Sequence, residues 1–159
     1  MNKKTLFQKV IDRLEKDREA MISAARATYE AATHEESEAE DQYDTRGLEA
    51  SYLAGAQAQR VADLEQLILQ YRFLTIEDLK ETDPIRATAL VELESSGKTL
   101  YCFLLPKGGG LHIEHEGHTV QIITPQSPLG EALLGRTAGE SAAIEGGKSS
   151  KEYEIISVQ

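Results

Sequence analysis

The sequence predicts an α+β protein in two parts, an N-terminal antiparallel helical hairpin over residues 1–80 and a small α+β domain over residues 84–159. Two observations lead to this prediction. Residues 5–44 contain neither proline nor glycine and repeat apolar side chains at steps of three and four, whereas short apolar runs after residue 84 alternate with turn signals. Asp83-Pro84 marks the boundary, because a residue that precedes proline disfavours the helical conformation.

The first helix is expected to begin at Thr5, whose hydroxyl suits the N-cap position. Its apolar stripe is narrow and is flanked by charge on both sides, which is typical of a coiled-coil seam rather than of a helix inside a globular core. The stripe consists of Leu6, Val10, Leu14, Met21, Ala24, Ala25, Thr28 and Ala32.

The helical pattern resumes at Leu48, so we expect the chain to turn at Thr45-Arg46-Gly47. Antiparallel pairing about that turn brings Met21 near Tyr71 and aligns the two apolar stripes. A helix of about 25 residues is ~38 Å long, so the hairpin should form a projecting arm. The second stripe consists of Leu53, Ala56, Val61, Leu64, Leu67, Ile68 and Tyr71.

In residues 84–159 the apolar pattern changes from the helical repeat to the alternation typical of β-strands. We expect strands at residues 87–94, 99–105, 120–124, 141–144 and 152–158, with a hairpin turn at residues 95–98. Ser127-Pro128 should cap and open a short helix that ends at Gly135. Leu129, Leu133 and Leu134 are its predicted inward residues.

Composition limits the classes of partner that the protein is expected to bind. The 159 residues carry a formal net charge of -10 without a basic cluster, which disfavours direct or sequence-specific nucleic-acid binding and favours a basic protein surface. The single cysteine, Cys102, lies in an apolar run and is expected to be packing rather than a nucleophile. No segment has the length of a signal peptide or a membrane span, so we expect a cytoplasmic protein without membrane partners.

Residues 35–52 are strongly acidic, with seven carboxylates against one base, Arg46. Like charges held close together are costly unless a cation or a basic partner meets them. Carboxylates at an arm's end suit Mg²⁺, although a solvated acidic loop is the plainer interpretation. A free arm has no walls to exclude water, so the chain is not expected to be an enzyme by itself and at most supplies residues to another protein's active site. A seam closed within one chain also predicts a monomer.

A second polar group contains His112, Glu114, His115 and His118. Histidines at this spacing can bind a transition metal, but alternate strand positions point to opposite faces. An exposed, glycine-rich β-hairpin is the favoured interpretation. The preceding glycines, residues 108–110, lack the lysine and hydroxyl of a phosphate loop and are interpreted as a turn.

Three segments resemble the bacterial Gre transcript cleavage factors. SPLGEALLGRTAGE (residues 127–140) and YEIISV (153–158) resemble the family's C-terminal signature, and VELESSGKTLYCFLL (91–105) resembles its preceding hairpin. The acidic helical hairpin is similar to the family's other half. The resemblance implies an FKBP-like C-terminal domain that docks on RNA polymerase, and a coiled coil that enters the polymerase secondary channel.

In that family the tip acids help to hold a second Mg²⁺ in the polymerase active site and so promote hydrolysis of backtracked RNA. By this resemblance Asp44, with Glu49 or Asp41, would be the catalytic acids. Asp44 and Glu49 would bind Mg²⁺ that is shared with the polymerase, and none would be bound tightly. Arg46 and Tyr52 would assist binding of the tip. The family's second acid falls on Gly47 here, and Glu49 is the nearest substitute.

The sequence leaves several functions open. The first is a transcription elongation factor that binds RNA polymerase and stimulates Mg²⁺-dependent cleavage. The second is a regulator that occupies the same channel without cleaving RNA. The others are a coiled-coil adaptor unrelated to transcription and a metal-dependent enzyme that uses the histidine group.

Overall fold

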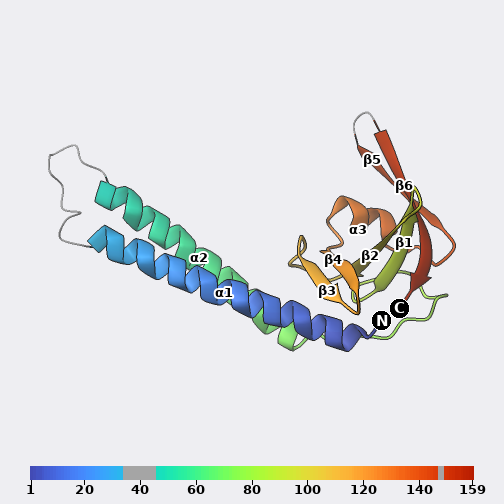
Figure 1. Ribbon diagram of the computed structural model, residues 1–159, viewed down its shortest axis with the longest axis horizontal. Coiled ribbons are helices and arrows are strands. Elements are labelled where there is room, and N and C mark those ends of the chain that lie inside the picture. The colour runs from blue at the N-terminus through green and yellow to red at the C-terminus, as the bar shows by residue number, and fades with distance from the viewer. Residues whose placement is uncertain (34–45, 147–148) are drawn as a thin grey trace. The chain divides into compact units, whose positions relative to one another are not determined.

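The computed structural model describes residues 1–33, 46–146 and 149–159 (Figure 1). The chain forms two compact units, one of residues Val10–Leu74 and one of Met1–Lys9 together with Thr75–Gln159. The predicted α+β class, with N-terminal helices and a C-terminal mixed sheet, is confirmed. The predicted division at residues 80–84 differs from these units chiefly at the N-terminus, where the first nine residues group with the sheet.

The helical unit contains α2 (Arg46–Arg72) and most of α1 (Lys3–Thr33), which lie side by side in Figure 1. The predicted cap of α1 is wrong. Asn2, not Thr5, caps the helix, since its side-chain oxygen accepts from the Thr5 backbone N–H at 3.0 Å. The predicted turn is also shifted, because Arg46 and Gly47 already belong to the first turn of α2.

The predicted seam is buried only in part, since Leu53 is 55% exposed and Ala24 and Ala56 are also exposed. Ile68 and Tyr71 are 3% and 2% exposed, and Val61, Leu64 and Leu67 are half-buried. The alignment of the helices is not the predicted one, however. Arg72 forms an ion pair with Glu15 at 2.6 Å, which sets the end of α2 about one and a half turns nearer the start of α1 than a Met21–Tyr71 pairing allows. Met21 is 38% exposed accordingly.

The sheet has six strands in the order β3-β4-β2-β1-β6-β5. Neighbouring strands are antiparallel except β2 and β4, which run parallel. Ser96 and Gly97 both have positive φ, 54° and 73°, which gives the tight β1–β2 turn that the sequence predicts. The strands are β1 (Leu90–Ser95), β2 (Lys98–Leu104), β3 (His112–His115), β4 (His118–Ile123), β5 (Ser141–Gly146) and β6 (Ser149–Val158).

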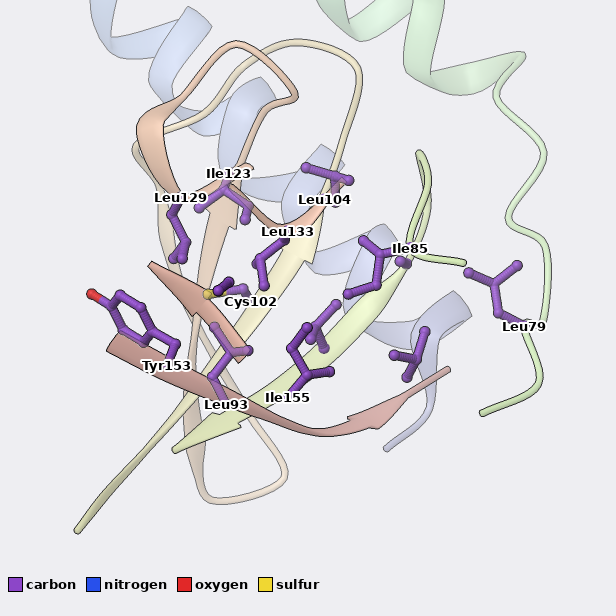
Figure 2. Close-up of a cluster of buried hydrophobic side chains, with 14 residues drawn as sticks. Leu79, Ile85, Leu93, Cys102, Leu104, Ile123, Leu129, Leu133, Tyr153 and Ile155 are labelled. Carbon is purple, nitrogen blue, oxygen red and sulfur yellow. The ribbon is translucent and has the colours of Figure 1, made fainter. Parts of the chain in front are cut away.

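One face of the sheet carries the main hydrophobic core (Figure 2). Leu93, Cys102 and Ile155 come from adjacent strands, and α3 (Pro128–Leu133) adds Leu129 and Leu133. The Ser127 side chain accepts from the Gly130 N–H at 3.1 Å, which confirms the predicted cap. Leu134 was predicted to point inward but is 49% exposed, because the helix has ended before it.

The first turns of α1 pack within the same unit as the sheet. The Phe7 ring meets Phe103 of β2 edge to face, with centroids 6.3 Å apart, and Leu6 is fully buried. Lys3 is also buried, and its ammonium donates to the backbone carbonyls of Thr88, at 3.0 Å, and Glu77. Burial lowers the pKa of this ammonium, while Asp78 opposes the shift.

Within residues 1–33 and 46–72, neither long helix has a stretch that is long and apolar enough to cross a bilayer.

We predict that Gly130→Ala destabilises the sheet unit. A Cβ at this position would collide with the Thr124 carbonyl oxygen and come within 2.8 Å of its carbon. The backbone cannot yield cheaply, so the free energy of unfolding should fall by about 2 kcal/mol or more in urea denaturation, although alanine is the better helix former.

The control is Gly55→Ala in α2, where a Cβ meets nothing within 4 Å. This change should stabilise its helix by about 0.5–1 kcal/mol. A stability for Gly130→Ala equal to or above that of the wild type would contradict the described seating of α3.

Candidate functional site

The candidate site is the acidic segment between the two long helices together with the start of α2. Asp44, a predicted catalytic residue and metal ligand, and Asp41, a predicted catalytic residue, lie outside the described residues. Arg46 and Glu49 belong to the first turns of α2. Tyr52 lies one turn further along and is 72% exposed, so a large amphipathic side chain is available to a partner there.

The start of α2 changes the geometry that the resemblance implies. Gly47 is part of the helix, and successive helical positions are 100° apart, so position 49 lies about 200° around the axis from position 47. Positions 47 and 49 therefore lie on different faces of α2. Position 49 lies one turn from Tyr52.

The helical unit also contains buried polar side chains. Among the described side chains, Arg18 Nε and Gln57 Oε1 are buried without a hydrogen-bond partner. Buried unpaired polar atoms weaken a seam, so its stability depends on buried apolar residues such as Ile68 and Tyr71. Burial raises the pKa of the Tyr71 hydroxyl well above its usual value.

The histidine group forms the predicted hairpin, with β3 and β4 joined by Glu116-Gly117 at φ 50° and 82°. The prediction that all its polar residues are exposed is wrong for His115, which is 3% exposed. Its Nε2 lies 3.3 Å from Glu116 Oε1, close enough for an ion pair but not aligned for a hydrogen bond. His118 instead packs against Tyr101. In the described part of the chain these side chains do not converge as a metal site.

Comparison with known proteins shows what the chain is similar to. The model of "Transcription elongation factor, GreA/GreB, C-term" matches residues 113–159. Transcription inhibitor protein Gfh1 of Thermus thermophilus is 26% identical over 154 residues, which cover 96% of this chain and 92% of that protein. Gfh1 of Thermus aquaticus is 23% identical over 152 residues, covering 96% and 91%. Transcription elongation factor GreA of Nitratidesulfovibrio vulgaris is 24% identical over 155 residues, covering 96% and 86%.

Solved structures give similar matches. The crystal structure of Thermus aquaticus Gfh1 aligns over 98% of this chain and 95% of its own, with 25% identity and a TM-score of 0.40. The GreA factor homolog 1 (Gfh1) of Thermus thermophilus aligns over 94% of both chains, with 24% identity and a TM-score of 0.39.

A helical hairpin joined to a small mixed-sheet unit is thus matched along nearly its whole length by sequence relatives of one kind. Residues 113–159 match the GreA/GreB family model, and nearly the whole chain is similar to Gre-type transcription factors. The resemblance seen in residues 91–105, 127–140 and 153–158 is confirmed.

We predict that Ile68→Asp unfolds much of the helical unit. Ile68 is 3% exposed, and an unpaired carboxylate in its place should cost several kcal/mol. Far-UV circular dichroism should show a loss of helix and a lower melting temperature.

Leu69→Asp is the matched control, because Leu69 is the next residue and is 54% exposed. It should change stability by less than about 1 kcal/mol. Equal effects of the two substitutions would mean that α2 does not bury the face described above.

We also predict that Cys102 is unreactive in the folded protein. Its side chain is fully buried, and burial raises the pKa of the thiol to about 12. At pH 8 only about one thiol in ten thousand would be ionised, so a disulfide reagent should label it at least ~100-fold more slowly than in denaturant. Rapid labelling of the native protein would reject the packing role.

Proposed function

We propose that this protein is a transcription factor that binds RNA polymerase and inserts the acidic end of its helical hairpin into the polymerase secondary channel. Three features support the proposal: similarity to Gre-type factors along nearly the whole chain, two long helices that share a seam, and an acidic segment between them. The similarity to Gre-type factors is the observation that carries it.

Two features would promote docking on a partner: the negative charge of segment 35–52 and the exposed aromatic side chain of Tyr52. The segment 35–52 has seven acids and one base, so it should be drawn to basic groups and metal ions and repelled by phosphates elsewhere. Tyr52 offers a large exposed contact close to these charges. The length of α2, 27 residues or about 40 Å, allows the charged end to reach into a deep channel.

We propose further that the protein regulates transcription without stimulating RNA cleavage. Gly47 supplies no ligand where the family carries its second acid, and position 49 lies on a different face of α2. Two carboxylates directed at one ion would be needed to raise its affinity, and a single Asp44 provides half of that set. The Gfh1 relatives, which match at 23–26% identity, carry the name transcription inhibitor.

In this proposal the protein has no chemistry of its own. Its arm offers charge and an aromatic contact but no enclosed site, and any Mg²⁺ it meets is shared with the polymerase rather than bound tightly. The protein acts as a monomer, since α1 and α2 close the seam within one chain. The adaptor alternative, in which the acidic end binds a basic protein unrelated to transcription, differs only in the partner.

We predict that the wild-type protein binds core RNA polymerase and slows elongation, but leaves backtracked RNA uncleaved when Mg²⁺ is raised. Asp44→Asn and Glu38→Gln should each weaken binding modestly and to a similar, salt-sensitive degree, because screened surface charges are largely interchangeable. Binding curves at two salt concentrations and a cleavage assay on a stalled complex measure these effects.

Two other outcomes have separate meanings. Cleavage that rises with Mg²⁺ and disappears in Asp44→Asn would replace the regulator by a cleavage factor and leave polymerase binding intact. Failure to bind polymerase at all would overturn the proposed function and favour the adaptor.

A further inference from the structure

A hollow of about 210 Å³ lies on the sheet unit, away from every residue discussed as a tip ligand. Sites for drug-sized ligands measure about 300–1,000 Å³, so this one suits a single small group. Its walls come from β1, β2, β4, β6, the β3–β4 turn and the chain ends, all within one compact unit. The lining residues are Met1, Leu90, Glu92, Tyr101, Glu116, His118, Ser157 and Gln159.

Glu92 has a fixed carboxylate at the centre of the sheet. It is paired across the sheet with Tyr101 on β2 and with Ser157 on β6. Each partner donates its hydroxyl to a different oxygen of the carboxylate, both at 3.3 Å. Neutral hydroxyl donors orient the charge without neutralising it, so the carboxylate retains lone pairs for a cationic guest.

Glu116 supplies a second negative charge at the rim. The Asn2 backbone N–H donates to its Oε1 at 3.1 Å, and this bond, helped by the neighbouring His115, keeps the pKa of the carboxyl low. His115 lies beside it almost fully buried, with neither ring nitrogen in a hydrogen bond. The Glu116 carboxylate therefore stays ionised and is held by the backbone N–H of Asn2.

Aromatic rings complete the wall. The Tyr101 and His118 rings are 4.6 Å apart at an interplanar angle of 50°. Burial and the Glu92 charge raise the pKa of the Tyr101 hydroxyl, so it remains a neutral donor. No lysine or arginine side chain is among the described lining residues, but Met1 lines the hollow and its α-ammonium helps to lower the pKa of the Glu116 carboxyl. This ammonium offsets the charge of Glu116, so Glu92, beside the aromatic rings, is the carboxylate that attracts an organic cation.

We propose that this hollow binds the ammonium or guanidinium group of an organic cation, with Glu92 as the acceptor. The group can come from a free amine or guanidine, or from a lysine or arginine side chain of another protein. The chemistry of recognition is the same for both sources. The proposal is independent of polymerase binding, since none of its residues is among the predicted tip residues.

The test is a titration of the full-length protein followed by amide NMR. The probes are ethylguanidinium, butylammonium and the peptide Gly-Arg-Gly, with butanol and inorganic phosphate as controls. We expect saturable shifts at Tyr101, His118 and Ser157 for the cations and none for the controls. Glu92→Gln, which keeps the shape of the side chain, should weaken binding about tenfold.

Glu94→Gln is the matched control, because Glu94 lies two residues along β1 and does not line the hollow. It should bind as the wild type does. Tyr101→Phe keeps the ring but removes the bond to Glu92, and should weaken binding by a smaller factor; it also serves if Glu92→Gln fails to fold. Tighter binding of the peptide than of ethylguanidinium would identify a protein side chain as the source, and the reverse a free guanidine.

Two results would overturn the proposal. One is the absence of saturable shifts at these residues with any of the three cations. The other is equal binding by wild type, Glu92→Gln and Tyr101→Phe, which would reveal only diffuse attraction to an acidic protein.

Discussion

The burial of Lys3 is the interaction on which the organisation of the chain depends. Lys3 is only 5% exposed, and burial of its charge is tolerated because its ammonium donates hydrogen bonds to the backbone carbonyls of Glu77 and Thr88. Thr88 adopts a positive φ of 71°, an uncommon conformation for a β-branched residue, and its carbonyl is one of the two acceptors. With Leu6 and Phe7 packed alongside, the first turns of α1 become part of the sheet unit. A single helix therefore supplies residues to both units.

Much of this fold follows from local pattern. The β1–β2 turn at Ser96-Gly97, the cap at Ser127 and the helix stop at Gly135 depend on a few neighbouring residues whose conformational preferences are strong, and all three were predictable. Leu134 was misplaced because a helical period was extended one residue past its end. The role of Lys3 was not predictable, since its acceptors lie more than 70 residues away. The parallel pairing of β2 and β4 is likewise a tertiary choice that no local signal specifies.

The candidate site was predictable only in part. Charge density identified the segment 35–52, and family resemblance supplied roles for Asp41, Asp44 and Glu49, but spacing in sequence cannot give direction in space. Gly47 is already part of α2. Position 49 is therefore close to position 47 in sequence but lies on a different face of the helix. The hollow beside Glu92 gave no sequence signal, because Glu92, Tyr101 and Ser157 come together only through strand register.

Site-specific photo-cross-linking tests the central claim, that the start of α2 is the end of the arm that enters RNA polymerase, most directly. A photoreactive phenylalanine analogue would replace Tyr52, which is 72% exposed, and a second variant would carry it at Ile156, an exposed position on β6. The account predicts that Tyr52 cross-links to polymerase segments lining the secondary channel, whereas Ile156 does not reach them. Cross-links from Tyr52 to the outer surface of the enzyme alone, or to no polymerase subunit while the complex forms, would contradict it.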